Sequence, residues 1–280
     1  LIELQMRKLN VNKKIRQIDF LDIEKYNFDN RKINLIDVKF DQKKPFKRIS
    51  NKSKAYIEKS FEIAIQILNK KITNKFINGP ISKKFFLKKR FLGITEYLAY
   101  KTKTKNFSML IYNKKLSVCP ITTHLPLKKV SKKINKNLIK KKVILINNFY
   151  KKYFKFRPKI AITGLNPHCE STDAFSEDDK IIKPTVKSLM KLNYRIFGPF
   201  AADTIFLNKN RKSFNVIIGM YHDQVLTPIK TLFEYDAINI TLGLPFLRIS
   251  PDHGPNERML GKNKSNPKSL IKALTFLDQR

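Results

Sequence analysis

The sequence predicts an α/β protein built around a mostly parallel central sheet. Short runs rich in β-branched residues alternate with longer segments whose apolar residues recur at helical spacing. Several of the short runs end in polar or reactive side chains, as strands do where open α/β sheets bind ligands. With 280 residues, 42% of them hydrophobic, the chain is long enough for one large domain or two lobes with a buried core.

Two segments carry the helical pattern most clearly. Apolar residues recur three and four positions apart over residues 53–71 and again over residues 132–154. The expected strands are the short apolar runs over residues 75–80, 116–124, 159–168, 215–224 and 237–245. Composition alone marks no internal repeat, linker or domain boundary.

The bulk properties argue against several classes of protein. No run of eighteen apolar residues occurs, so no membrane span is expected. The first residues lack the pattern of a secretory signal, and two cysteines, Cys119 and Cys169, do not make a disulfide scaffold. A reducing cytoplasm is therefore the expected location. Because the sequence begins with Leu1 rather than Met, we expect the natural chain to extend upstream.

The net charge of +36 raises the question of nucleic-acid or membrane binding. The lysines are scattered along the whole chain, arginine is sparse beside them, and no zinc finger, RNA-recognition signature or basic zipper occurs. This pattern indicates that surface positions have drifted in composition toward Lys, Asn and Ile. It argues against nucleic acid as the main partner. A basic surface would still attract anionic metabolites.

Three of the four histidines lie at the ends of different predicted strands. His124, His168 and His222 follow the runs 116–124, 159–168 and 215–224, and they converge if those strands are neighbours. Three imidazoles with an open remaining position are typical of a zinc-type catalytic site. Their separations of 44 and 54 residues match no short metal motif, and a single histidine at a strand end is more often a hydrogen-bonded core or loop residue.

Charged residues near these histidines extend the hypothesis. Asp203 and Asp223 are candidates for further ligands or for groups that orient the ligands, and are otherwise turn or helix-cap residues. Lys230 could transfer a proton near a metal-bound oxygen, although most lysines of this chain are expected to be solvated. Arg248 suits the capture of a carboxylate or phosphate. Neither G-x-G-x-x-G nor a Walker A loop occurs. These residues predict metal-assisted chemistry on a small anionic substrate.

The order of several motifs adds a resemblance. "TGLNPH", "GPFAADTIF", "MYHDQ", "NITLGLPFLR" and "DHG" follow one another, and "NGPISK", "TEYLA" and "TTHLPL" precede them. Together they resemble the 4-hydroxythreonine-4-phosphate dehydrogenase family of pyridoxal phosphate biosynthesis over roughly residues 53–280. The resemblance implies the two-lobed architecture of isocitrate and isopropylmalate dehydrogenases, with lobes at about 1–93 plus 250–280 and at 94–249. It also implies a homodimer whose active site is shared across the interface.

The resemblance implies an activity as well. NAD or NADP would accept hydride from the carbon that bears the hydroxyl of 4-phosphohydroxy-L-threonine, and decarboxylation would give 3-amino-2-oxopropyl phosphate. The matched positions imply His124, His168 and His222 as ligands of zinc, magnesium or cobalt; Thr95, Lys230, Asn239 and Arg248 as substrate-binding residues; and Asp203 and Asp223 as acidic residues of the site. We expect Lys230 to be the general acid/base, with Asp223 as the competitor. Asp252, His253 and Gly254 lie in a segment that resembles the cofactor loop of isopropylmalate dehydrogenases.

Three departures from the family pattern matter. Ile94 stands where the family has a histidine that touches substrate, which keeps open a sister dehydrogenase acting on erythronate or threonate 4-phosphate. Cys169 and Glu170 begin a segment that replaces the glycine-rich stretch of the family. The sequence does not contain the "PGDPAGIGPE"-like first strand and turn of the family. We interpret the sequence as a fragment of a longer chain. The alternative from a different functional class is a binding protein that kept the fold but lost catalytic turnover. The intact set of three histidines argues against this alternative.

Overall fold

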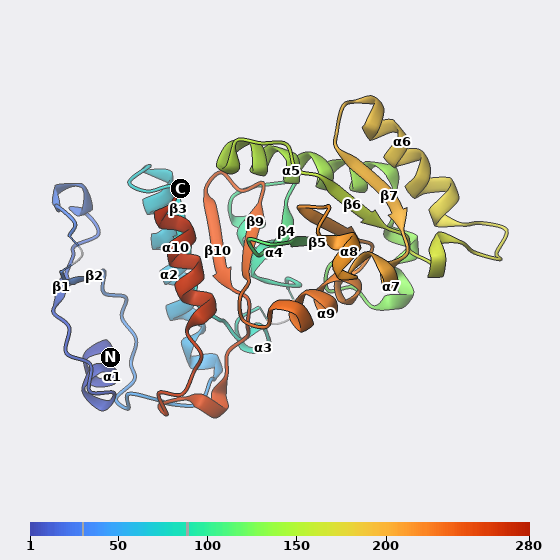
Figure 1. Cartoon of the computed structure of the whole chain (residues 1–280). Coiled ribbons are helices and arrows are strands. Elements are labelled where there is room, and N and C mark those ends of the chain that lie inside the picture. Colours follow the sequence, from blue (N-terminus) through green and yellow to red (C-terminus); the bar gives the residue numbers. More distant parts are fainter. Residues whose placement is uncertain (30, 88–89) are drawn as a thin grey trace. The chain divides into compact units, whose positions relative to one another are not determined.

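The computed structural model describes residues 1–29, 31–87 and 90–280 and divides the chain into two compact units (Figure 1). Unit 1 comprises Leu1–Phe76, Pro80–Phe91 and Gly254–Pro267, and unit 2 comprises Ile77–Gly79, Leu92–His253 and Lys268–Arg280. The lobes expected from the sequence, 1–93 with 250–280 against 94–249, stay a prediction. In the compact units, the C-terminal residues from Lys268 onward belong with the central sheet.

The central sheet has eight strands in the order β3-β10-β9-β4-β5-β8-β6-β7. Their bounds are β3 Lys75–Ile77, β4 Ser108–Tyr112, β5 Ser117–Pro120, β6 Ile160–Thr163, β7 Ile196–Phe200, β8 Val216–Gly219, β9 Ile238–Leu242 and β10 Leu247–Pro251. The pairs β5–β8, β8–β6 and β6–β7 are parallel, whereas β4–β5, β4–β9 and β9–β10 are antiparallel. All five predicted runs form strands, and the α/β class is confirmed.

Helices cover both faces of this sheet in unit 2 (Figure 1). They are α4 Ile94–Lys101, α5 Lys136–Phe154, α6 Lys183–Lys191, α7 Ala202–Ile205, α8 Asn208–Arg211, α9 His222–Phe233 and α10 Lys268–Asp278. Leu110 and Ile218 face the layer that contains α5, α6 and α10, while their neighbours Ile111 and Ile217 face α7 and α9. Because side chains alternate along a strand and both faces are covered, the buried strands are continuously apolar.

The clearest predicted helix of unit 2 begins at a side-chain cap. The pattern over 132–154 becomes α5, which starts at Lys136 because Asn135 Oδ1 accepts a hydrogen bond from the backbone N–H of Leu138 (2.9 Å). Its buried face includes Ile139, Val143 and Ile146, each fully buried. The helix therefore supplies the apolar layer over the centre of the sheet, where the candidate site residues are anchored.

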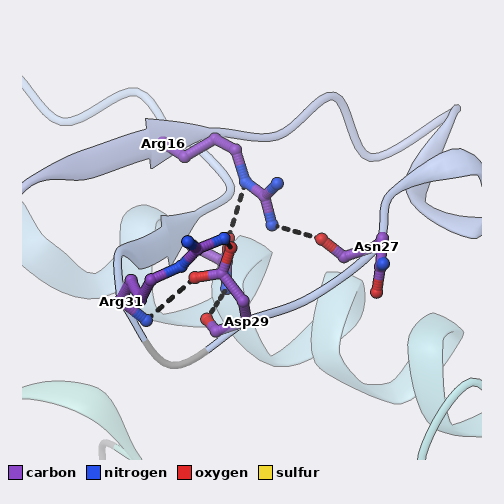
Figure 2. A network of polar contacts seen from close by, with 5 residues as sticks. Arg16, Asn27, Asp29 and Arg31 are labelled. Carbon is purple, nitrogen blue, oxygen red and sulfur yellow. Dashed lines mark hydrogen bonds and ion pairs between the residues drawn. The ribbon is translucent and has the colours of Figure 1, made fainter.

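Unit 1 contains the remaining elements. They are α1 Ile2–Lys8, β1 Ile15–Gln17, β2 Ile33–Leu35, α2 Lys54–Asn69 and α3 Lys83–Phe86. The predicted helix over 53–71 corresponds to α2, and β1 pairs with β2 in parallel. Figure 2 shows the polar network beside this pair, in which Arg16 donates to Asn34 Oδ1 (2.9 Å) and to the Asn27 carbonyl (2.7 Å), and Asp29 accepts from the backbone N–H of Arg31 (2.8 Å).

Over the described part of the chain, no helix has both the length and the apolar character that crossing a membrane requires.

Candidate active site

The three histidine-bearing strands are neighbours in the sheet. β5, β8 and β6 lie side by side and parallel, so their carboxyl ends share one edge. His124 follows β5, and His222 opens α9 directly after β8. Their ring centroids lie 5.6 Å apart with an interplanar angle of 37°. The structure therefore brings two of the three predicted histidines together.

The third histidine is not part of this pair. His168 lies in the short helical turn Pro167–Cys169 after β6, where it is exposed and has a left-handed backbone (φ 55°, ψ 12°). Within residues 1–29, 31–87 and 90–280, no three His, Cys, Asp or Glu side chains are grouped so that they could hold a metal ion. The strand order thus places His168 at the same edge of the sheet as His124 and His222. It does not bring the three imidazoles close enough together to form a set of metal ligands.

The donor chemistry of the pair nevertheless fits a divalent cation. His222 Nδ1 lies 2.6 Å from Asp223 Oδ1, and His124 Nδ1 lies 3.9 Å from Glu96 Oε1. Metal-binding histidines commonly engage one ring nitrogen with a carboxylate, which orients the ring and leaves the other nitrogen for the metal. His222 has this arrangement, while Glu96 Oε1 lies on the Nδ1 side of His124 beyond hydrogen-bond distance.

Glu96 is a site residue that sequence reasoning missed. It lies in the first turn of α4, and Thr123 Oγ1 is 3.4 Å from its Oε1. The glycine that caps α4 allows the approach, since a Cβ on Gly93 would lie 2.8 Å from Glu96 Oε2 and 3.2 Å from His124 Cε1. The motif "TEYLA" contained this glutamate, but nothing in its spacing pointed to His124.

Gln224 ties the ends of β6 and β8 together. Its Oε1 accepts from Thr163 Oγ1 (2.8 Å) and from the backbone N–H of Met220 (2.7 Å), while its Nε2 donates to the Gly164 carbonyl (2.8 Å). Gln224 stands in the first turn of α9, which His222 begins. One side chain therefore fixes the helix that carries His222 against the start of the turn that carries His168.

A second cluster lies in the antiparallel part of the sheet. Arg248 on β10 is buried, donates from Nε to Asn78 Oδ1 (2.7 Å) and donates from Nη1 to Thr241 Oγ1 (2.9 Å) and Thr95 Oγ1 (3.4 Å). Burial lowers the pKa of Arg248 to about 10, and the Glu96 carboxylate partly opposes this shift. The structure thus joins Thr95 and Arg248, two residues that the resemblance placed at the substrate.

Asn239 on β9 has an open hydrogen-bonding site. Its Oδ1 atom is buried and has no hydrogen-bond partner among the residues that the structure describes. A buried polar atom without a partner costs free energy, and a ligand that donates a hydrogen bond would remove that cost. The position therefore suits an amino or hydroxyl group of a substrate.

Lys230 and Asp252 form an ion pair. Lys230 Nζ lies 2.5 Å from Asp252 Oδ2 and donates to the Asp252 carbonyl (2.6 Å). Burial raises the pKa of Asp252, with Lys230 acting in the opposite direction. The predicted acid/base thus contacts a residue predicted for the cofactor.

The remaining predicted residues are exposed. Asp203 lies in α7, Asp223 in the first turn of α9, and His253 and Gly254 follow β10. The division between the units falls between His253 and Gly254. The hydrogen-bond partners of Arg248 are Asn78, Thr95 and Thr241 rather than any of these four residues.

Known proteins resemble this chain over most of its length. The family model described as pyridoxal phosphate biosynthetic protein PdxA matches residues 2–277. A 4-hydroxythreonine-4-phosphate dehydrogenase of Sulfurihydrogenibium sp. is 42% identical over 247 residues, which are 86% of this chain and 74% of that protein. A D-threonate 4-phosphate dehydrogenase of Pectobacterium atrosepticum is 34% identical over 179 residues, which are 64% of this chain and 55% of that protein.

A solved structure extends the likeness to the fold. The 4-hydroxythreonine-4-phosphate dehydrogenase of Klebsiella pneumoniae matches with a TM-score of 0.79 at 27% identity, covering 96% of this chain and 86% of the other. The family match starts at residue 2, so it also includes residues upstream of 53, where the motifs of the resemblance begin. This chain therefore belongs to the PdxA family of pyridoxal phosphate biosynthetic proteins.

Proposed function

We propose that this chain is an NAD(P)-dependent 4-hydroxythreonine-4-phosphate dehydrogenase of pyridoxal phosphate biosynthesis. The hydroxyl-bearing carbon of 4-phosphohydroxy-L-threonine gives a hydride to the nicotinamide, and the hydroxyl proton passes to a base. The resulting β-keto acid then loses carbon dioxide, giving 3-amino-2-oxopropyl phosphate. The observation that carries the proposal is the pairing of His124 with His222 in a chain that belongs to this family.

The histidines have a defined part in this proposal. His124, His222 and His168 would hold a divalent cation (zinc, magnesium or cobalt), which when bound polarises the reacting substrate oxygen. Asp223 fixes the ring orientation of His222 from the Nδ1 side, and Glu96 Oε1 lies 3.9 Å from His124 Nδ1. Asp203, exposed on α7, remains a candidate acidic residue of the site.

Lys230 is the proposed general acid/base. Its ion pair with Asp252 holds the ammonium group in one place, so the proton it exchanges has a fixed position. Asp223 is the competitor, but its carboxylate already pairs with His222 Nδ1 at 2.6 Å. Both candidates are paired, but Asp223 is paired with a proposed metal ligand, which favours Lys230 for proton transfer.

The phosphate would bind at the start of α4. Gly93 caps this helix without a side chain, so the first backbone N–H groups of α4 are suited to an anion. Thr95 lies in the same turn, and Arg248 donates to its hydroxyl (3.4 Å). Asn239 Oδ1 would accept a hydrogen bond from the amino or hydroxyl group of the substrate.

NADH formation tests the proposal. Wild-type protein with 4-phosphohydroxy-L-threonine, NAD and added zinc or magnesium should produce NADH, and His222→Ala should abolish it. His253→Ala is the matched histidine control, because it should raise the KM for NAD and leave metal binding unchanged. A folded, metal-loaded wild-type protein without activity on this substrate would overturn the proposal.

A sister substrate is the second candidate. Ile94 replaces the histidine of the family at the first position of α4, beside Thr95, and one relative is named a D-threonate 4-phosphate dehydrogenase. Assaying 4-phosphohydroxy-L-threonine, threonate 4-phosphate and erythronate 4-phosphate side by side separates the candidates. If Ile94 sets the choice, Ile94→His should move the ratio of kcat/KM toward 4-phosphohydroxy-L-threonine.

The proposal includes assembly and location. We propose a homodimer in the cytoplasm, with each active site shared across the interface and with no nucleic-acid or membrane partner. Analytical ultracentrifugation measures the dimer. Mixing His222→Ala with Arg248→Leu chains should restore part of the activity if the site combines residues of two subunits, and should restore none if each subunit is complete.

A further inference from the structure

A buried carboxylate lies under the turn that leads to His168. Asp178 is fully buried and begins the π-helical segment Asp178–Ile182, which leads into α6. Its Oδ1 accepts from the backbone N–H of Leu165 (2.9 Å), and its Oδ2 accepts from the backbone N–H of Asn166 (3.1 Å) and from Asn166 Nδ2 (3.0 Å). A buried carboxylate is tolerated when several N–H groups donate to it. The three hydrogen bonds therefore hold residues 165 and 166 against Asp178.

The anchored turn has an unfavourable backbone conformation further along. His168 and Cys169 both have positive φ angles, 55° and 62°. Non-glycine residues in this region are strained and persist only where surrounding contacts fix them. The turn is closed by hydrogen bonds from Cys169 N to the Asn166 carbonyl (3.1 Å) and from Glu170 N to the Pro167 carbonyl (3.1 Å). Asn166 is therefore both the residue that Asp178 holds and the start of the strained turn.

Gly164 lets the carboxylate approach the backbone. A Cβ at this position would lie 2.6 Å from Asp178 Oδ1 and 2.8 Å from Cys169 Sγ, so a larger residue would displace the anchor. The carbonyl of Gly164 is held from elsewhere by Gln224 Nε2 (2.8 Å). The turn is thus bound to α9 through Gln224 and to the π-helical segment through Asp178.

We infer that Asp178 is a positioning residue for His168. This inference rests on the proposed function, in which His168 joins His124 and His222 at a metal. With residues 164–166 fixed, metal binding has to order only the two side-chain torsions of His168. If the turn were released, its backbone torsions would also have to be ordered on binding, which costs conformational entropy. Residues that orient metal ligands typically change metal affinity 10- to 100-fold when replaced.

The test is cobalt binding by Asp178→Asn. The amide has the shape of the carboxylate but replaces one acceptor oxygen by an NH2 group that faces N–H donors. We expect Co2+ to bind about 10- to 100-fold more weakly than to the wild-type protein. The absorption spectrum of the bound Co2+, which reports the number of nitrogen ligands, should shift toward that of His168→Ala, because binding without His168 becomes more competitive. Asp179→Asn is the matched control, because Asp179 is the exposed neighbour and pairs with Lys183 (2.6 Å).

Each outcome decides the matter. If Asp178→Asn binds Co2+ with wild-type affinity and spectrum, the inference is overturned and the proposed function stands. If the wild-type protein binds no Co2+, the proposed metal site fails and the inference fails with it. If Asp178→Asn does not fold, Asn166→Ala decides, since it removes the side-chain donor to Asp178 (3.0 Å), together with a longer contact to Glu177 (3.4 Å), and keeps both backbone donors. It should weaken Co2+ binding several-fold with the spectrum shifted in the same direction, and wild-type behaviour would overturn the inference.

Discussion

The two halves of the central sheet carry their candidate site residues in different ways. In the parallel half, β5, β8 and β6 end before the functional residues, so His124, His168 and His222 lie on turns or at a helix start. In the antiparallel half, Asn239 and Thr241 lie within β9 and Arg248 lies within β10. The strand ladder itself fixes the second group. Side chains from other elements, Gln224 and Asp178, have to fix the surroundings of the first.

This difference separates stability from site geometry. Replacing a strand-borne residue leaves buried partners without hydrogen bonds, so the free energy of unfolding should fall. Replacing a residue near the turns should change the positions of ligands more than the stability of the fold. Four variants test this contrast, and the expected effects decrease in the order in which they follow.

Arg248→Leu should show the largest loss of stability. The change leaves Asn78 Oδ1 and the hydroxyls of Thr241 and Thr95 without their donor, and we expect the free energy of unfolding to fall by about 3 kcal/mol. Urea unfolding measures this. Arg258→Leu, at an exposed position, should stay within about 0.5 kcal/mol of wild type. An unchanged midpoint for Arg248→Leu would mean that the cost of burying the guanidinium cancels its three contacts.

Gln224→Met should lower the free energy of unfolding by about 2 kcal/mol. The reason is that three buried groups lose their hydrogen-bond partner: the Met220 N–H, the Thr163 hydroxyl and the Gly164 carbonyl. Urea unfolding gives the loss, and the exposed Gln66→Met on α2 is the control. The same variant should weaken metal binding. A loss of stability with unchanged metal affinity would show that the link between β6 and β8 serves the fold alone.

Gly93→Ala should affect metal binding more than stability. The new Cβ would meet Glu96 Oε2 at 2.8 Å and His124 Cε1 at 3.2 Å, so the side chains must shift. We expect the free energy of unfolding to change by less than about 1 kcal/mol and the metal affinity to fall by roughly 10- to 100-fold. Zinc titration measures the affinity, and Gly79→Ala, which has open space, is the control. Wild-type affinity would remove Glu96 from the site.

Lys142→Met should have the smallest effect. This buried lysine of α5 donates to the Phe107 carbonyl (2.9 Å) just before β4, beside the junction of the two halves. Burial lowers its pKa, and Cys119 and Glu96 oppose that shift. The variant loses one hydrogen bond and one buried charge, so its stability at neutral pH should lie within about 1 kcal/mol of wild type.

The pH dependence of Lys142→Met has a defined sign. Because the folded pKa of Lys142 lies below its unfolded value, the penalty for the charged form is fully present below the folded pKa. It is relieved as pH rises from the folded pKa toward the ordinary value of about 10.5. The free energy of unfolding of wild type should therefore rise relative to that of Lys142→Met as the pH increases through this alkaline range. A constant difference in unfolding free energy across that range would contradict this account.

The parallel half of the fold was largely predictable from local patterns. Parallel strands buried on both faces are short continuous apolar runs, and the three that carry histidines were identified as strands. Their shared edge follows from the general rule for α/β sheets. The antiparallel half was less accessible, because strand direction depends on pairing partners far along the chain. β4 and β10 were not identified, and neither was β7 of the parallel half. Asn239 and Thr95 were identified as site residues only through the family resemblance, whereas the chemistry of Arg248 had already suggested an anion-binding role.

The anchors were not predictable for a related reason. Asp178 stands in an acidic stretch that resembles solvent-exposed chain, yet it is fully buried because residues 165 and 166 donate to it. Gln224 was noticed beside His222, but its partners lie about 60 residues away in sequence. Likewise, the left-handed backbone of His168 is a local detail that no periodicity encodes. Hydrogen bonds of this kind become visible only in the folded chain.

The location of the candidate residues within one unit has a consequence for tolerance to sequence change. All the candidate residues except Gly254 belong to unit 2, and Gln224 joins the strand ends from which His222 and the His168 turn arise. The relative positions of the histidine-bearing turns are therefore set by hydrogen bonds inside unit 2. A substitution confined to unit 1 should leave the separation of His124 and His222 unchanged, so sequence changes in unit 1 can accumulate without altering the geometry of this pair.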